Sequence, residues 1–433
     1  MRARGSWRTE AQTANRLLRS HFFEVMEALR LGLQGPDNGS AATGPGGAQR
    51  ADGGAKAALL AFVRERGPEA GISRRMLTDL LGRPERRFET EKLKRFFAAK
   101  RVLITGAAGS IGSALAERLA EIGCAQLSLL DHFDHSLLDL FERIRRAAPA
   151  QPVSDILCDI RDPGRLQAVM RTAKPDVVLH AAALKHVHLG ERHPIECVLT
   201  NLVGMGNTLA AAASAGAAHF ILVSSDKAAA PVCIMGGTKR LAELHVAGFA
   251  AESAMSMRLK SVRFGNVLGS QGSVLPRFAA QIEAGGPLEV THPEMERYFM
   301  TPAEAVGFIL SVAAFEDERA GSAYMMEMGG PVSILAIGKE MIRRSGKRVE
   351  IATTGLRPGE RVKESLFDDC EIVERCGMDG VFRMSAKSAS MLVSSADVAQ
   401  LEAMARGFDN AVVRQRLFAY VNERLGRGER AVG

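Results

Sequence analysis

Residues 101–112 read Arg101-Val-Leu-Ile-Thr-Gly106-Ala-Ala-Gly109-Ser-Ile-Gly112, an apolar run that enters a glycine-rich turn. A helical pattern follows from Ser113, so this order predicts a strand, a tight turn and a helix. Glycines suit such a turn because they let the backbone approach a pyrophosphate and let the helix pack closely on the strand. We therefore expect the turn to bind a dinucleotide cofactor. Its expected contact residues are Gly106, Gly109, Ser110, Ile111 and Gly112.

The next apolar run, residues 127–130, leads to an aspartate at position 131. A carboxylate at the end of a second strand can accept hydrogen bonds from the hydroxyls of a ribose, and it repels a 2′-phosphate. We therefore expect Asp131 to bind the cofactor and to favour NAD, with NADP as the alternative cofactor. The other interpretation of Asp131 is an ordinary surface residue at the end of a strand.

Strand and helix patterns keep alternating along the chain, with apolar runs at 153–157, 176–179 and 219–223. This alternation predicts an α/β fold, a doubly wound and mostly parallel Rossmann sheet with helices on both faces. The segments that follow successive strands meet at one edge of such a sheet, where ligands bind. The residues expected beside the cofactor at this edge are Asp159, Ile160, Ala181, Ala182 and Ala183. For the three alanines, simple packing of helix on sheet is the alternative.

Composition along the chain suggests four regions. Residues 1–56 include a stretch rich in Gly, Ala, Asp and Asn, which predicts a flexible tail and linker. Residues 57–99 are expected to form a short helical lead-in, and residues 100–265 the NAD(P)-binding Rossmann domain. Residues 266–433 are expected to form a smaller, interleaved substrate-binding lobe, with segments that return to the Rossmann scaffold.

The overall composition excludes several classes of protein. The net charge of +7 is spread along the chain, and one Trp and three Tyr leave few stacking platforms, so nucleic acid is not an expected partner. The six cysteines show no Cys-x-x-Cys spacing, which argues against a zinc site or a disulfide framework. No apolar window reaches the roughly 18–20 residues needed to cross a bilayer. We expect a cytoplasmic homo-oligomer without a transmembrane segment or a bound metal.

The segment Ser224-Ser225-Asp226-Lys227 follows the run 219–223, and Met235-Gly-Gly-Thr-Lys239 begins eight residues after the first lysine. Together these two segments resemble the catalytic region of a short-chain dehydrogenase/reductase. The usual pattern of that family is Tyr-x-x-x-Lys, and this chain has methionine in place of the tyrosine. The only tyrosines are Tyr298, Tyr324 and Tyr420, and the residues four places later are Pro302, Met328 and Arg424. No tyrosine–lysine dyad is therefore possible at helical spacing, and other groups must perform the chemistry.

Seven motifs occur in order between about residue 76 and about residue 370. They are 180–187 (HAAALKHV), 225–228 (SDKA), 235–240 (MGGTKR), 263–270 (RFGNVLGS), 291–294 (THPE), 297–301 (RYFMT) and 354–360 (TGLRPGE). Together they resemble the capsular-polysaccharide-type nucleotide-sugar 4,6-dehydratases, an extended branch of the short-chain dehydrogenases. The resemblance implies conversion of a UDP-N-acetylhexosamine, most often UDP-N-acetylglucosamine, to a UDP-4-keto-6-deoxy sugar for surface polysaccharide biosynthesis.

The resemblance also implies roles for individual residues. Asp226 would be the acid at the C6 oxygen of the sugar and Lys227 the base at C5, while Ser225 would orient the C4 oxygen. Lys239 would bind the nicotinamide ribose, and Met235 would pack against substrate or cofactor, because a thioether cannot act as a base. We expect burial beside the cationic nicotinamide and Lys239 to lower the pKa of Lys227. The residues expected at the nucleotide sugar are Lys185, Asn266, Arg297, Arg357 and Glu360.

Three alternatives stay open at this stage. A nucleotide-sugar 4-epimerase would be favoured by a tyrosine dyad and does not need an Asp-Lys pair. A catalytically dead NAD(P)-binding regulator would fit the missing tyrosine, although the joint presence of Asp226, Lys227 and Lys239 argues against it. The Asp-Lys pair itself would be a solvated turn pair if it had no catalytic role. The sequence does not identify the group that takes the proton of the C4 hydroxyl.

Overall fold

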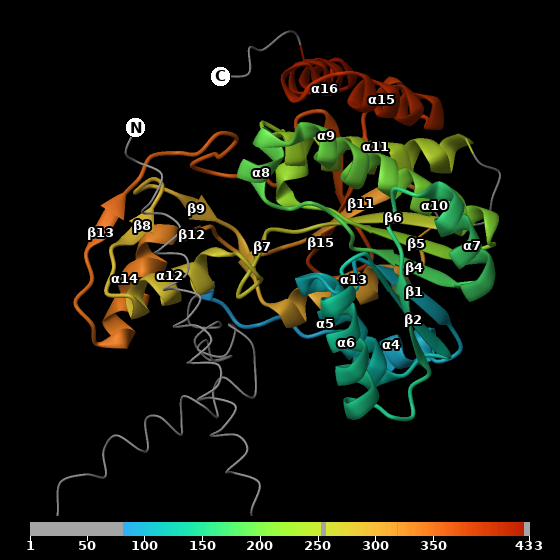
Figure 1. Cartoon of the computed structure of the whole chain (residues 1–433), viewed down its shortest axis with the longest axis horizontal. Coiled ribbons are helices and arrows are strands. Elements are labelled where there is room, and N and C mark those ends of the chain that lie inside the picture. The colour runs from blue at the N-terminus through green and yellow to red at the C-terminus, as the bar shows by residue number, and fades with distance from the viewer. Residues whose placement is uncertain (1–80, 253–256, 318, 428–433) are drawn as a thin grey trace, which may run out of the picture. The chain divides into compact units, whose positions relative to one another are not determined.

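The computed structural model describes residues 81–252, 257–317 and 319–427 (Figure 1). The expected flexible tail, residues 1–56, lies outside the described residues, as does the lead-in up to residue 80. The described part of the lead-in contains helix α4 (Thr90–Phe97), which buries Leu93 and Phe97.

A nine-stranded sheet forms the centre of the described structure, in the order β14-β15-β11-β6-β5-β4-β1-β2-β3. The seven strands from β3 to β11 are parallel to their neighbours, and β15 and β14 continue the sheet in antiparallel fashion. The predicted doubly wound and mostly parallel α/β sheet is therefore confirmed. The strands are β1 (Arg101–Thr105), β2 (Gln126–Asp131), β3 (Val153–Leu157), β4 (Val177–His180), β5 (His219–Val223), β6 (Arg258–Arg263), β11 (Ser322–Met326), β14 (Glu371–Arg375) and β15 (Val381–Ala386).

Helices cover both faces of this sheet, which explains why its central strands are nearly continuous apolar runs. Successive residues of a strand point to opposite faces. Val102 and Ile104 of β1 accordingly pack in the core under α4, α5, α6 and α13, whereas Leu103 packs in the core under α7, α10, α11, α15 and α16 (Figure 1). The helices are α5 (Ser110–Ile122), α6 (Asp134–Ala147), α7 (Pro163–Ala173), α10 (Met205–Ser214), α11 (Ile234–Glu252), α13 (Pro302–Ala314), α15 (Ser395–Gly407) and α16 (Asn410–Arg424).

Three shorter helices and two single turns complete the set of elements around the sheet. They are α8 (Val187–Arg192), α9 (Pro194–Cys197), the π-helix η1 (Val198–Gly204), and the 3₁₀ turns η2 (Asp226–Ala228) and η3 (Ala389–Met391). The turn η2 follows β5 directly and carries two of the expected catalytic residues.

A smaller lobe is built around a third hydrophobic cluster that includes Leu275, Phe278 and Ile337. Its elements are β7 (Asn266–Val267), α12 (Val274–Glu283), β8 (Leu288–Val290), β9 (Glu296–Arg297), β10 (Phe299–Met300), β12 (Val332–Ser333), α14 (Ile334–Ser345) and β13 (Ile351–Thr353). These short strands pair two by two as β7 with β10, β8 with β13, and β9 with β12. Between and after these elements the chain returns to the large sheet as α13, β11, β14 and β15 (Figure 1).

None of the helices in the described ranges combines the length and the apolar character that a membrane span requires.

Candidate functional site

The glycine-rich turn joins β1 to α5 and has no room for a side chain at Gly106 or Gly112. Gly106 has a φ of +66°, and a Cβ there would lie 2.5 Å from the Cα of Ala182. A Cβ on Gly112 would lie 2.1 Å from the carbonyl oxygen of Gly106. Helix α5 begins at Ser110 without a side-chain cap from any residue that the structure describes. The turn thus offers open backbone and a helix N-terminus, which suit the phosphates of a dinucleotide.

Asp131 lies at the end of β2 and is buried with 6% of its surface exposed. Its Oδ2 accepts a hydrogen bond from the backbone N–H of Ala108 at 2.9 Å, which belongs to the glycine-rich turn. Its Oδ1 accepts from the N–H groups of His132 and Phe133 at 2.7 and 3.1 Å. The carboxylate therefore braces the turn, a role that the sequence did not indicate. Its contact with a ribose remains a prediction.

The other segments expected beside the cofactor lie at the same edge of the sheet. Asp159 forms an ion pair with Arg161 at 2.7 Å, and hydrogen bonding by this guanidinium holds the pKa of Asp159 below its usual range. Ile160 is buried against Gly204, and the backbone of Ala182 lies against Gly106. The carboxyl ends of β1 to β4 thus converge, as expected for a ligand site in a doubly wound sheet.

A buried asparagine that the sequence did not single out holds the segment after β4. Asn201 accepts from the N–H of Leu184 at 2.8 Å and donates to the carbonyl of the same residue at 3.1 Å. It also donates to the hydroxyl of Thr238 on α11 at 3.1 Å. Lys185, expected at the sugar, is exposed and donates to the carbonyl of Gln271 at 2.7 Å. Asn201 escapes detection in the sequence because its partners lie far from it in the chain.

The expected catalytic segment forms a compact, buried network at the end of β5. The Ser225 hydroxyl accepts from the N–H of Lys227 at 3.3 Å and donates to Asp226 Oδ1 at 3.0 Å. Lys227 Nζ donates to Asp226 Oδ1 at 2.9 Å and to Asn266 Oδ1 at 3.2 Å. Asp226 is fully buried and the Lys227 side chain is 16% exposed. The pair is therefore not a solvated turn, which removes that alternative.

One oxygen of Asp226 stands out within this network. Its Oδ2 is buried and has no hydrogen-bond partner among the residues that the structure describes. A buried polar atom without a partner carries a free-energy cost that a bound ligand can relieve.

Met235 and Lys239 lie one turn apart at the start of α11, and both are buried. Lys239 Nζ donates to the carbonyl of Val223, the last residue of β5, at 2.8 Å. Burial lowers the pKa of Lys239 to about 8, and the carboxylate of Glu243 opposes this effect. The lysine therefore lies directly behind the Asp226–Lys227 segment.

The expected lowering of the pKa of Lys227 is wrong for this structure, in which its pKa is raised. Burial is the largest effect and acts to lower it, but the carboxylates of Asp226 and Glu364 together outweigh burial. The sequence could not show this, because Glu364 reaches the lysine from a distant part of the chain.

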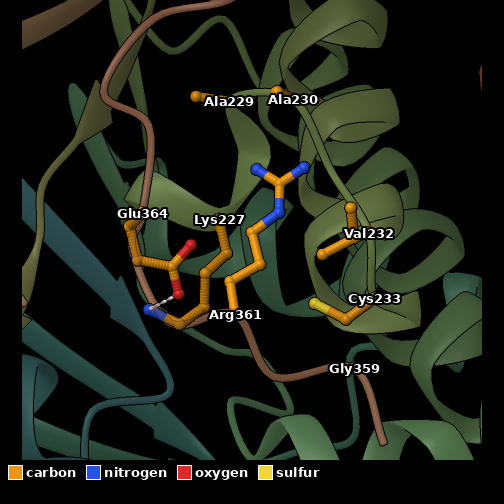
Figure 2. A pocket seen from close by; sticks show the side chains of 8 residues that line it. All are labelled: Lys227, Ala229, Ala230, Val232, Cys233, Gly359, Arg361 and Glu364. Carbon is orange, nitrogen blue, oxygen red and sulfur yellow. Dashed lines mark ion pairs between the residues drawn. The ribbon is translucent and has the colours of Figure 1, made fainter. Parts of the chain in front are cut away.

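A small pocket opens beside Lys227 (Figure 2). Its lining residues are Lys227, Ala229, Ala230, Val232, Cys233, Gly359, Arg361 and Glu364. Gly359 has a φ of +78°, and a Cβ there would lie 2.9 Å from the Cβ of Cys233, so glycine allows the segment to close on α11. Arg361 and Glu364 were not predicted as site residues, although they directly follow the motif that ends at Glu360.

The other residues that were expected to bind the nucleotide sugar lie in two kinds of environment. The terminal nitrogens of Arg297 donate to the carbonyls of Glu296, Arg361 and Val362 at 2.7, 2.8 and 3.1 Å. This guanidinium therefore braces the segment that lines the pocket. Glu360 accepts from the N–H of Arg357 at 3.0 Å and closes its own turn. By contrast, the guanidinium groups of Arg357 and Arg361 have no hydrogen bond or ion pair within the described ranges, and Arg361 points into the pocket (Figure 2).

A buried charge cluster lies behind the catalytic segment and consists of Arg240, Glu243, Arg263 and Glu371. Each arginine pairs with both glutamates at 3.2 Å or less, and all four side chains are at most 4% exposed. The Ser224 hydroxyl donates to Glu243 at 2.6 Å. The cluster thus ties the end of β5 to α11, β6 and β14.

No group of three His, Cys, Asp or Glu side chains suited to a metal ion occurs in the part of the chain that the structure describes.

Known proteins resemble this chain over the region that carries the site. Residues 102–386 match the family model described as polysaccharide biosynthesis protein. The capsular polysaccharide biosynthesis protein CapD of Staphylococcus aureus is 37% identical over 309 residues, which cover 70% of this chain and 51% of CapD. The chain thus spans about half the length of that relative. A UDP-glucose 4-epimerase of Rickettsia canadensis is 32% identical over 297 residues, which cover 66% of this chain and 83% of the epimerase.

Solved structures share the same fold. Pen from Bacillus thuringiensis aligns with a TM-score of 0.62 and 28% identity, over 67% of this chain and 91% of Pen. DesIV, a dTDP-glucose 4,6-dehydratase from Streptomyces venezuelae solved with NAD and TYD bound, aligns with a TM-score of 0.53 and 20% identity, over 61% of this chain and 87% of DesIV. Since the family model covers more than half of its length, the chain belongs to the polysaccharide biosynthesis protein family.

Proposed function

We propose that this protein is an NAD-dependent nucleotide-sugar 4,6-dehydratase that converts a UDP-N-acetylhexosamine, first of all UDP-N-acetylglucosamine, to a UDP-4-keto-6-deoxy sugar. The observation that carries the proposal is the buried Asp226–Lys227 pair at the end of β5. Elimination of water across C5 and C6 of a 4-keto sugar needs a base at C5 and an acid at the C6 oxygen. A carboxyl and an amine held 2.9 Å apart supply both groups side by side.

The residues around the glycine-rich turn fit NAD. Gly106 and Gly112 let the turn pack closely on the segment after β4 and on the start of α5, and the uncapped N-terminus of α5 is suited to a pyrophosphate. Asp131 would accept from the adenosine ribose and disfavour a 2′-phosphate, and Lys239 would bind the nicotinamide ribose. Asp159, Ile160 and the 181–183 segment would line the adenine and nicotinamide sides. When bound, NAD would take hydride from C4 of the sugar and later return hydride to C6.

Asp226 and Lys227 can become the acid and the base without exchanging a proton with solvent. A carboxylate next to an ammonium contains the same protons as a carboxylic acid next to a neutral amine. Transfer of one proton along the hydrogen bond from Lys227 to Asp226 therefore creates the acid and the base together. Lys227 then takes the C5 proton, and Asp226 gives its proton to the departing C6 hydroxyl. The Ser225 hydroxyl already donates its hydrogen to Asp226. It would therefore orient the C4 hydroxyl of the sugar by accepting a hydrogen bond from it.

The pocket beside Lys227 would hold only part of the nucleotide sugar. The guanidinium groups of Arg357 and Arg361 are without partners in the described ranges, and their planar donors suit a diphosphate. Asn266 accepts a hydrogen bond from Lys227 and would orient the sugar. Arg297 and Glu360 would hold the segment 357–364 in place, and they would also contact the nucleotide. Lys185 is proposed at the entrance to the site.

A 4-epimerase is the second candidate, because the Rickettsia canadensis relative carries that name. An epimerase returns hydride to C4 and leaves the mass of the sugar unchanged. The methionine at position 235 disfavours this reaction, since it replaces the phenol that would move the C4 proton.

Incubation of the protein with NAD and a panel of UDP-sugars, followed by mass spectrometry, tests the proposal. Loss of one water from a UDP-N-acetylhexosamine is expected, whereas an isomer of unchanged mass would indicate an epimerase and refute dehydration. In deuterated water, Lys227→Met should bind ligands yet stop both dehydration and deuterium incorporation at C5. Asp226→Asn should slow dehydration by a factor of about 100 or more. Lys363→Met, which changes an exposed lysine on the neighbouring segment, should leave the rate unchanged.

A further inference from the structure

Glu364 is a buried carboxylate that lies between two cations of the site. Its side chain is 7% exposed, and its Oε1 lies 3.6 Å from Lys227 Nζ (Figure 2). The same oxygen lies 3.7 Å from the Nε of Arg297. No pattern in the sequence selects this glutamate, because it follows the last recognised motif and meets Lys227 only in the folded chain.

The charged and titratable groups around Lys227 come from four parts of the chain. Asp226 lies on η2 itself, Arg297 on β9, Glu364 and Arg361 on the segment after β13, and Cys233 immediately before α11. The amine donates to Asp226 and to the neutral amide oxygen of Asn266, and Glu364 is the remaining anion near it.

This arrangement matters because an amine acts as a base only after it has lost a proton. Asp226 can accept that proton through its hydrogen bond, whereas Glu364 lies beyond ordinary hydrogen-bond distance and acts mainly through its charge. A negative charge at this distance stabilises the ammonium form. The raised pKa of Lys227 agrees with this geometry, since burial alone would lower it and the two carboxylates reverse the sign.

Glu364 also belongs to the segment that carries the two unpartnered guanidinium groups. Arg297, which pairs with Glu364, donates to the backbone carbonyls of residues 361 and 362. The position of this carboxylate is therefore fixed by the same bonds that shape the proposed nucleotide-sugar pocket.

We propose that Glu364 is a positioning residue for Lys227, which holds the amine in the pocket and governs the pH at which it can accept a proton. The role of that proton in catalysis rests on the proposed dehydratase function, but the coupling between Glu364 and Lys227 does not. The coupling can therefore be measured even in a protein that dehydrates no sugar.

The direct test is an NMR titration of full-length protein labelled with [6-¹³C]lysine. The signal that disappears in Lys227→Arg identifies the residue. Glu364→Gln keeps the size of the side chain and removes its charge, so the titration midpoint of Lys227 should fall by about one pH unit or more. Glu364→Asp retains the charge and should give a midpoint nearer to that of the unmodified protein. An unchanged midpoint in Glu364→Gln would overturn the proposal.

Glu296→Gln is the matched control, because Glu296 neighbours Arg297 in the chain but pairs with Lys363. It should leave the midpoint of Lys227 unaltered, and a fall equal to that of Glu364→Gln would also overturn the proposal. Thermal unfolding of each variant checks that the fold is retained.

The pH profile of kcat/KM for dehydration supplies the second readout. The active form is the Asp226–Lys227 pair that still holds its shared proton, and this proton is lost as the pH rises through the midpoint of Lys227. A lower midpoint in Glu364→Gln therefore moves the basic limb of the profile to lower pH by the same amount. Should the unmodified protein release no water while the titration of Lys227 still shifts, the dehydratase function fails and the coupling stands. A shifted titration together with an unmoved basic limb would refute the control of catalysis by Glu364.

Discussion

Substitution of Glu243 by glutamine should destabilise the protein strongly, because it breaks the buried charge cluster. The four charges of the cluster sum to zero. Glu243→Gln leaves Arg240 and Arg263 with Glu371 alone, so one positive charge remains uncompensated among side chains at most 4% exposed. Removal of one partner from a buried ion pair costs about 3–5 kcal/mol. We expect a loss near the lower bound, about 3 kcal/mol, because Arg263 and Arg240 both retain Glu371.

Urea unfolding followed by far-UV circular dichroism measures this loss, with an unchanged dependence on urea as the sign that only stability has changed. Two comparisons isolate the cause. Ser224→Ala removes one hydrogen bond to Glu243 and should cost about 1 kcal/mol. Glu402→Gln breaks a pair with Arg406 on the exposed side of α15 and should cost less than about 1 kcal/mol. A loss below about 1 kcal/mol in Glu243→Gln would refute the argument that the cluster acts as one neutral unit.

Three further predictions concern the site. Gly112→Ala should abolish NAD binding in calorimetry, because its Cβ would lie 2.1 Å from the carbonyl oxygen of Gly106 and would displace the glycine-rich turn. Binding at normal affinity would contradict the need for this close packing. Burial, and then the charge of Lys239, lower the pKa of His180 to about 3. The unfolded chain therefore takes up a proton first below pH ~6.5, and stability is lost by about 1.4 kcal/mol per pH unit as the pH falls from there toward about 3. His180→Asn should reduce this slope in urea unfolding, and an equal slope would contradict it. Met235→Tyr should retain dehydration in the mass-spectrometric assay, and complete loss with normal ligand binding would show that the shape of methionine is required.

The sequence predicted the parts of the fold that depend on local pattern. Alternating apolar runs and helical periods specify the parallel strands from β1 to β5, and the glycines of 106–112 specify the turn between β1 and α5. Asp226 and Lys227 could be selected because they follow a buried strand and precede the helix that carries Lys239. In each of these cases the information lies within a few residues of the feature.

The remaining features depend on contacts between distant segments, which a single sequence does not specify. Glu364 reaches Lys227 only because the 357–364 segment folds back over the loop between η2 and α11. Burial lowers the pKa of Lys227, and the carboxylates of Asp226 and Glu364 raise it. The expectation of a lowered pKa was wrong because it took no account of Glu364. The guanidinium of Arg297, which was expected at the nucleotide sugar, donates to the backbone carbonyls of Arg361 and Val362 at the start of the 361–364 segment.

The adjacency of Asp226 and Lys227 poses a geometric problem that the turn η2 solves. Consecutive residues of a strand point to opposite faces, so an acid and a base at neighbouring positions of β5 could not serve the same sugar. The strand ends at Val223, and the Ser225 hydroxyl accepts from the N–H of Lys227 and so caps a single 3₁₀ turn. Within that turn the amine bends back to the carboxylate, and Lys227 lines the pocket while Asp226 is buried directly behind it. Ser225 therefore shapes the proposed acid–base pair, and the turn brings its two groups together without a tyrosine on α11.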